Sequence, residues 1–167
     1  MVSLRLAALD DLPALRALIP VSVRALSRGY YSAAQIESAI RFVFGPDTQL
    51  IADGTYFAAA ADDAVIIGCG GWSRRRTLSR IRSGRIRAFF VHPDWARQGI
   101  ASRIMSACFE AAQASGFQRL ELMATLPGES LYRAFGFEAA ERVDTTLPDG
   151  VSIPFVRMVR GIGGALG

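Results

Sequence analysis

The sequence contains no lysine, since all 19 of its cationic residues are arginines. It has one histidine, His92, and this excludes a metal centre built from several histidine ligands. Its two cysteines, Cys69 and Cys108, lie far apart in apolar segments, which indicates buried free thiols instead of a disulfide framework. No apolar run approaches the roughly 18 residues that a helix needs to span a bilayer. We therefore expect a protein with no metal cofactor and no membrane partner.

The composition is that of an ordered globular chain. Of the 167 residues, 51% are hydrophobic and only 20% are charged, which is enough apolar material for one domain with a sizeable core. Asp10 and Asp11 interrupt the stretch where the apolar part of a secretory signal would continue, so we expect a cytoplasmic protein. The net charge is only +4 and acids are interleaved with the arginines, which disfavours nucleic acid as a partner. Exclusive use of arginine suits anionic partners, and it can equally reflect genomic composition.

Hydrophobic periodicity predicts an alternation of strands and helices along the chain. Ser32 followed by Gln35 is a capping-box signature, and Asp10 is the expected N-cap of the first helix. The expected elements are, in order, a strand at 3–9, helices at 10–26 and 33–44, a hairpin at 55–72, a strand at 86–92, a helix at 100–115, a strand at 117–125, a short helix at 128–135 and two strands within 136–160.

This order of elements predicts an α/β (α+β) fold, in which a mixed, mostly antiparallel sheet is flanked by helices. A right-handed strand–helix–strand crossover is expected around residues 85–124. We expect a single domain at 1–160 and a tail at 161–167. The glycines of the tail resemble a binding motif only superficially, because nothing helical need follow them as a glycine fingerprint requires.

The segment V-H-P-D-W-A-R-Q-G-I-A at 91–101 joins an apolar strand to a helix through a glycine turn. The first N–H groups of a helix have no partner within it, and its dipole places partial positive charge there, so such a turn can bind an anion. Small residues at Gly99, Ala101 and Ser102 would let a pyrophosphate approach the backbone. The Walker sequence is absent because the chain has no lysine, and the dinucleotide fingerprint G-x-G-x-x-G is absent as well.

Together with L-Y-R-A-F-G-F at 131–137, this segment resembles the GCN5-related N-acetyltransferase (GNAT) superfamily. Both signature regions occur in the family's order, and the resemblance covers essentially the whole chain. Against the family motif Gln/Arg-x-x-Gly-x-Gly/Ala, Gly99 and Ala101 match, whereas Ala96 stands in the first position and Arg97 lies one place late. The resemblance implies a single-domain GNAT-like fold and transfer of an acetyl group from acetyl-CoA to the amine of a small molecule, by direct attack.

The resemblance also implies which residues bind acetyl-CoA. The strand that ends at Phe90 and Val91 is expected to splay from the strand at 117–125, with the pantetheine arm in the gap and the Val91 N–H polarising the acetyl carbonyl. Tyr132 matches the residue that often protonates the departing CoA thiolate, although an amphipathic tyrosine can also simply pack a short helix. The expected cofactor-binding residues are Phe90, Val91, Arg97, Gln98, Gly99, Ile100, Ala101, Ser102 and Tyr132.

The residues on the acceptor side depart from the family pattern. Many relatives place a glutamate on the strand before the glycine turn, and Arg85 and Arg87 occupy that strand here. Glu121 on the neighbouring strand is the expected catalytic carboxylate; Glu129 or a water chain is the alternative, and Glu121 can also be a solvated strand residue. The two arginines face one way, where they would contact an acidic acceptor or form a solvated edge. The residues expected to bind the acceptor are Tyr30, Tyr31, Trp72, Arg85 and Arg87.

Two other functions stay open on the sequence alone. The acceptor can instead be an amine of a protein or peptide. A catalytically idle acyl-CoA-binding module on the same fold would keep the turn at Gly99 and lack turnover. The identity of the acceptor, the length of the acyl chain, the general base and a homodimeric state are left open.

Overall fold

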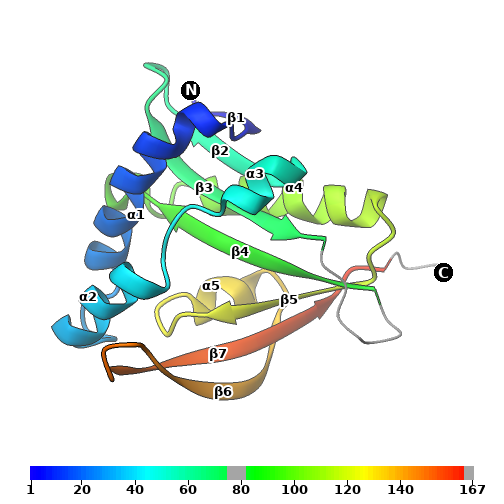
Figure 1. Cartoon of the computed structure of the whole chain (residues 1–167). Helices are drawn as coiled ribbons and strands as arrows, with labels where there is room; N and C mark the ends of the chain where they lie inside the picture. Colours follow the sequence, from blue (N-terminus) through cyan, green and yellow to red (C-terminus); the bar gives the residue numbers. More distant parts are fainter. Residues whose placement is uncertain (75–81, 164–167) are drawn as a thin grey trace.

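The computed structural model describes residues 1–74 and 82–163. They form a seven-stranded sheet in the order β1-β2-β3-β4-β5-β7-β6, with helices on both faces (Figure 1). The strands are β1 (Ser3–Leu6), β2 (Tyr56–Ala60), β3 (Ile66–Ser73), β4 (Ser83–Val91), β5 (Arg119–Ala124), β6 (Glu138–Thr146) and β7 (Ser152–Gly161). The helices are α1 (Leu12–Leu26), α2 (Ala33–Phe42), α3 (Thr48–Asp53), α4 (Ile100–Ala114) and α5 (Glu129–Ala134). Among these described helices, none combines the length and apolarity that crossing a bilayer requires.

The central strands β4 and β5 run parallel and are joined by the predicted crossover through α4, whereas the other neighbouring strands pair antiparallel. Their pairing is short, extending from Ser83 opposite Arg119 to Arg85 opposite Glu121. Beyond this point the two strands diverge (Figure 1). Ala88, at a φ of 54°, adopts a left-handed conformation within β4 at an irregularity in its pairing with β3. A gap therefore opens between the carboxyl-terminal halves of β4 and β5.

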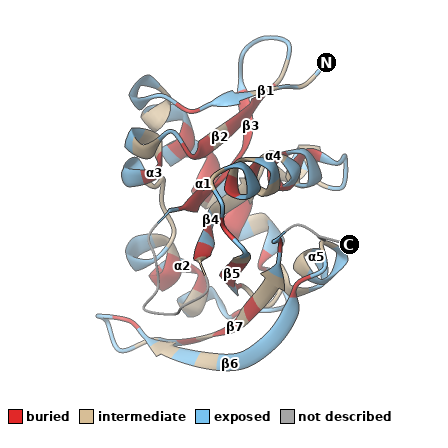
Figure 2. Cartoon of the chain, turned by 90° about the vertical axis from the view of Figure 1, so that its right-hand side faces the viewer, coloured by how far each residue is buried: buried red, intermediate tan, exposed pale blue. Residues whose placement is uncertain are grey.

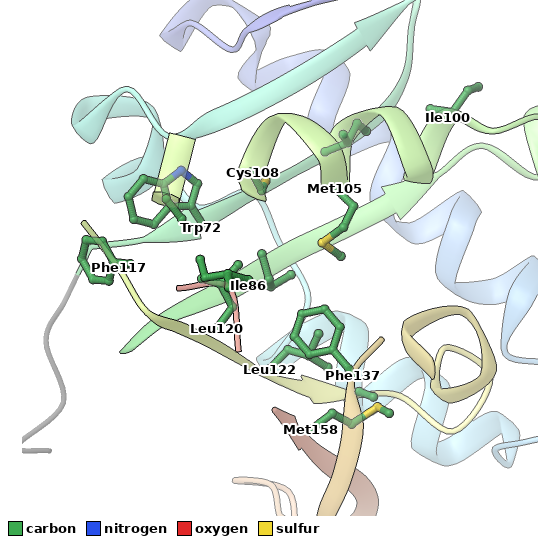
Figure 3. Packing of buried hydrophobic residues seen from close by; sticks show 14 of the residues in the cluster. Trp72, Ile86, Ile100, Met105, Cys108, Phe117, Leu120, Leu122, Phe137 and Met158 are labelled. Atoms are coloured by element: carbon green, nitrogen blue, oxygen red, sulfur yellow. The ribbon is translucent and has the colours of Figure 1, made fainter. Parts of the chain in front are cut away.

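Two apolar cores lie on opposite faces of the sheet. Both cysteines are buried free thiols, as predicted. Beneath α4 the core includes Trp72, Ile104, Met105, Cys108, Leu120, Leu122 and Met158 (Figure 3). Beneath α1, α2 and α3 it includes Leu15, Ile19, Leu50, Tyr56, Cys69 and Ile153. Burial is concentrated in the central strands, whereas β6 at the edge is largely exposed (Figure 2). The most buried part of the sheet is therefore the region around β3, β4 and β5.

Helix α2 begins with the predicted capping box. The Ser32 hydroxyl accepts the backbone N–H of Gln35 at 3.1 Å, and the Gln35 side chain accepts the backbone N–H of Ser32 at 2.9 Å. Each bond satisfies a donor that the first turn of a helix would otherwise leave unpaired. The local sequence is sufficient to start this helix, which ends at Phe42, two residues earlier than expected.

Helix α1 begins later than the sequence predicts. Residues Leu9–Asp11 form a short 3-10 turn, and the residue preceding α1 is Asp11 instead of the expected Asp10. The Asp11 carboxylate accepts the backbone N–H of Ala8 at 2.7 Å and forms a bidentate ion pair with Arg5. The ion pair with Arg5 on β1 holds Asp11, and not Asp10, at the start of α1. No local sequence pattern indicates this ion pair.

Two further features of the fold differ from the sequence prediction. The sequence prediction does not include helix α3, because its six residues are too few to show a helical period. Its ends nevertheless carry recognisable signals: Asp47 accepts the N–H of Leu50 at 3.2 Å, and Gly54 closes the helix at a φ of 71°. The second difference is the tail, expected from residue 161. Strand β7 includes Gly161, and Ile162 is only 5% exposed within the core.

Candidate active site

A cleft of about 1120 Å³ runs along the gap between β4 and β5. One end lies at the first turn of α4 and the other at ionisable side chains of β4, β5 and β7. Among residues 1–74 and 82–163, no His, Cys, Asp or Glu side chains are grouped as a metal ion would require. The sequence-predicted residues that line the cleft are Tyr30, Arg85, Arg87, Phe90, Val91, Arg97, Gly99, Ile100, Ala101, Ser102, Glu121 and Tyr132.

The glycine turn presents the amino-terminal end of α4 to the cleft. Gly99 has a φ of 80° and Arg97 a φ of 60°, so the chain turns sharply twice before the helix. A side chain at position 99 would meet no atom within 4 Å, so glycine is favoured there by its backbone angle and not by crowding. The Arg103 N–H bonds to the Gly99 carbonyl at 3.1 Å. The N–H groups of residues 100–102 precede this first helical bond and are oriented out of the helix end.

Side chains next to the turn hold its shape. The Gln98 amide donates to the Asp94 carbonyl at 3.2 Å, and the His92 ring nitrogen Nδ1 accepts the Asp94 N–H at 3.1 Å. Gln98 lies outside the cleft lining, so its side chain braces the turn instead of facing a ligand. His92 has the turn-shaping position that its place before a proline suggests.

The end of β4 presents a backbone donor to the gap. The His92 N–H bonds to the Ile67 carbonyl on the β3 side at 2.8 Å. Because successive N–H groups of a strand point in opposite directions, the Val91 N–H is directed to the β5 side, where pairing has ended. Phe89 and Phe90 contribute apolar lining on either side of the sheet. The gap thus combines an unpaired amide with apolar walls.

Tyr132 stands on α5 at the wall of the same cleft. Its ring packs edge-on against Phe137, with centroids 6.1 Å apart. Burial, and secondarily the proximity of Cys108, raises the pKa of the phenol well above its ordinary value of about 10. The hydroxyl is therefore protonated at neutral pH and can donate a hydrogen bond.

One cleft is therefore lined by a turn that presents helix amides, by a splayed strand pair and by a partly buried tyrosine. The family model described as an acetyltransferase (GNAT) domain matches residues 52–139, which include all of β2 to α5. The chain belongs to the GNAT family. The uncharacterized N-acetyltransferase YsnE of Bacillus subtilis is 30% identical over 92 residues, a match that covers 52% of this chain and 58% of that relative.

Solved structures show that the likeness in fold extends well beyond the segment that the family model matches. A GCN5-related N-acetyltransferase from Rhodopseudomonas palustris superposes with a TM-score of 0.76 at 20% identity, covering 95% of this chain and 94% of that one. The PaiA N-acetyltransferase of Thermoplasma acidophilum, solved in complex with coenzyme A, gives a TM-score of 0.69 at 16% identity over 96% and 99% of the two chains. At these identities the likeness concerns the fold, and it confirms the predicted architecture.

Paired charged side chains line the end of the cleft that lies away from α4, and these residues form its floor. Glu121, 8% exposed, lies between Arg85 at 3.6 Å and Arg157 at 3.3 Å. Arg87 pairs with Asp47 at 3.1 Å. The sequence prediction missed Asp47 and Arg157, since Asp47 caps a helix too short to recognise and Arg157 enters through the β5–β7 pairing.

Trp72 does not lie where the sequence analysis predicted, which was in contact with the acceptor. Its side chain is fully buried beneath α4, where the ring packs edge-on against Phe117 with centroids 5.1 Å apart (Figure 3). It lies on the face opposite the paired charges and outside the cleft lining. Trp72 is therefore a core residue of the GNAT fold.

The two tyrosines between α1 and α2 have different environments. Tyr30 is 56% exposed and lines the cleft, as an acceptor contact would. Tyr31 is 7% exposed and lies outside the cleft lining, so the prediction that it contacts the acceptor is wrong. Its hydroxyl donates to the Pro154 carbonyl at 2.7 Å and accepts the Leu126 N–H at 2.9 Å. Tyr31 thus ties together the segments that surround the site.

Proposed function

We propose that this GNAT-family protein is an acyl-CoA-dependent N-acetyltransferase that moves an acetyl group from acetyl-CoA to the amine of a small molecule by direct attack. The observation that carries the proposal is the continuity of one cleft from the α4 amino terminus, through the β4–β5 gap, to the charged floor. Acetyl-CoA suits the first part of this path and an amine suits the last. Acetyl-CoA is a cytoplasmic metabolite, and we place the activity in that compartment.

In this proposal the turn binds the pyrophosphate of acetyl-CoA. The N–H groups of residues 100–102 and the positive end of the α4 dipole favour a dianionic group. Small side chains at Gly99, Ala101 and Ser102 let it approach, and Arg97 adds a charge at the rim. The pantetheine arm would follow the apolar gap beside Phe90.

The same proposal assigns the chemistry to three groups. The Val91 N–H donates to the acetyl carbonyl and stabilises the charge that develops on its oxygen during attack. A neutral amine forms the new C–N bond, and its surplus proton passes to Glu121 along a chain of waters, because Glu121 pairs with Arg85, well back along β4 from Val91. As the C–S bond breaks, the Tyr132 hydroxyl donates a proton to the departing thiolate. The products are an N-acetylated amine and free CoA, with no acyl-enzyme.

Gly99→Glu tests the cofactor half of the proposal. The carboxylate would occupy the mouth of the turn and repel a pyrophosphate, so calorimetry should show a large loss of CoA affinity. Gly150→Glu is the matched control, because Gly150 also has a left-handed φ of 86° and open space but sits at the β6–β7 turn. Equal CoA affinity in both variants would exclude the turn as the pyrophosphate site.

The catalytic half requires a screen of amines with acetyl-CoA, read by release of free thiol. Turnover of small amines supports the proposal. Turnover confined to peptides with a free amine would move the acceptor to the protein class. CoA binding without thiol release from any amine would identify a non-catalytic acyl-CoA-binding module.

A further inference from the structure

Five ionisable side chains gather on the floor of the cleft, away from the α4 turn. Asp47 comes from the residue before α3, Arg85 and Arg87 from β4, Glu121 from β5 and Arg157 from β7. Three cations face two anions inside the cleft, and Glu141, outside the cleft, also pairs with Arg157 at 2.9 Å. The attraction of the cleft for an anionic ligand therefore depends on which of these charges the ligand can reach.

The acidic and the basic side chains of the floor are not equally exposed to solvent. The side chains of Glu121 and Asp47 are only 10% and 17% exposed. The side chains of Arg85 and Arg87 are 57% and 50% exposed, and that of Arg157 is 38% exposed. The acids therefore lie behind the arginines, and a ligand that enters the cleft meets guanidinium groups first.

The buried acids orient the arginines and leave them with donors to spare. Arg85 and Arg87 each face their acid through Nε, Arg85 toward Glu121 and Arg87 toward Asp47. A guanidinium has five N–H donors in a planar fork, so terminal N–H groups remain for a ligand. Arg85 and Arg87 are two residues apart on one strand and share a face, which places their side chains about 7 Å apart at the backbone. This arrangement suits a compact anionic group with two acceptor oxygens, and a carboxylate matches that geometry.

The rim of the cleft has a different character from its floor. Several large apolar side chains that are exposed to solvent line this same cleft. They are Leu26, Tyr30, Val43, Met123 and Leu131, each between 39% and 56% exposed. Exposed apolar groups gathered at one opening mark a binding surface for an apolar part of a ligand.

From these observations we propose that the acceptor is an amine that also carries a carboxylate and an apolar body, with the carboxylate bound by Arg85 and Arg87. The inference rests on the proposed acetyltransferase function and specifies its substrate class. Arg157 completes the positive floor through its contact with Glu121. Amphipathic amino acids and aromatic or branched amino carboxylates belong to this class.

Calorimetry on the protein saturated with CoA tests the inference without requiring turnover. The probes are leucine and phenylalanine, each compared with its amide, which keeps the amine and the apolar body and removes only the negative charge. The acid should bind at least about tenfold tighter than the amide, as expected when a charged hydrogen bond is lost. The aminophosphonate analogue of leucine separates carboxylate from phosphonate recognition, and tighter binding of the phosphonate would overturn the assignment.

The variants Arg85→Gln and Arg87→Gln test whether these two arginines cause the preference for the acid over the amide. Either replacement should reduce the preference for acid over amide severalfold while CoA affinity stays unchanged. Arg16→Gln, on the exposed surface of α1 outside the cleft, is the matched control and should keep the full preference. Equal binding of acid and amide, absence of binding by both, or an unchanged preference in both cleft variants would overturn the inference. Thiol release with neutral amines alone would also overturn it and would leave the acetyltransferase proposal standing, whereas the proposal itself fails if no amine is acetylated.

Discussion

The Tyr31 hydroxyl and the backbone N–H of Leu126 form a 2.9 Å hydrogen bond between two segments that are 95 residues apart. Tyr31 lies between α1 and α2, and Leu126 lies in the connection from β5 to the helix that carries Tyr132. The same hydroxyl donates to Pro154 on β7. Burial is the main cause of the raised pKa of Tyr31, which keeps the hydroxyl protonated and able to make both bonds.

Tyr31→Phe should therefore affect stability and catalysis together. The ring can stay in place, but the Leu126 N–H and the Pro154 carbonyl lose their partner in a buried site, at a cost of about 1–3 kcal/mol. Urea denaturation should show this loss, and kcat should fall because the loop before Tyr132 is less firmly held. Tyr30→Phe makes the same chemical change on the exposed neighbour and should leave the urea midpoint unaltered. An unchanged midpoint in Tyr31→Phe would contradict the bridging role.

Tyr132→Phe should lower kcat and leave the affinity for CoA unchanged. The ring keeps its packing against Phe137, so CoA affinity and the melting temperature should stay near those of the parent. Loss of a general acid typically lowers the rate by about 10²- to 10⁴-fold. Because the pKa of the phenol is raised, the parent should show no loss of activity from Tyr132 ionisation up to about pH 10. Steady-state kinetics under conditions where chemistry limits the rate provide the measurement. A full kcat in the variant would remove Tyr132 from the mechanism, and a tenfold drop would indicate a positioning role.

Glu121→Gln separates proton acceptance from simple charge pairing. As a base, Glu121 should contribute about 10²-fold or more to the rate with the acceptor, and the deficit should shrink at high pH, where the free amine is already neutral. Glu141→Gln is the control, because Glu141 pairs with Arg157 at 2.9 Å from outside the cleft. A deficit that is the same at every pH would indicate that Glu121 only holds the arginines. Equal rates in the two variants would exclude it as the base.

Asp11 makes the stability of the fold depend on pH. Its hydrogen bonds to Arg5, the largest cause, hold the pKa of the carboxyl below its ordinary value of about 4. A carboxyl with a depressed folded pKa stabilises the protein above its unfolded pKa, and this contribution is lost as pH falls through the folded pKa. Asp11→Asn should thus have a lower urea midpoint than the parent at pH 7, and the two should converge below about pH 4. Arg5→Gln removes the same pair and should show the same convergence. A constant difference across this range would contradict the linkage.

The local sequence was sufficient to predict the parts of the site that depend on neighbouring residues. The left-handed turn at Gly99, the start of α2 at Ser32 and the helix of Tyr132 follow from interactions within a few residues. The GNAT signature regions are likewise short stretches of chain. Because these stretches are local, the fold class was predictable from the sequence, and the sequence also named most of the residues that line the cleft near α4.

Tertiary structure decided which of the residues predicted for the charged end of the cleft lie there, and it added others. Strand β3 is buried along its whole length, so no alternation of polar and apolar residues indicates which face Trp72 takes. Tyr30 and Tyr31 are adjacent, and only the bonds of Tyr31 to Leu126 and Pro154 turn it inward. Arg157 meets Glu121 because β7 inserts between β5 and β6, a strand order that costs chain entropy and is repaid only by the packed sheet. Contacts between residues far apart in sequence depend on register and packing, and no local pattern specifies them.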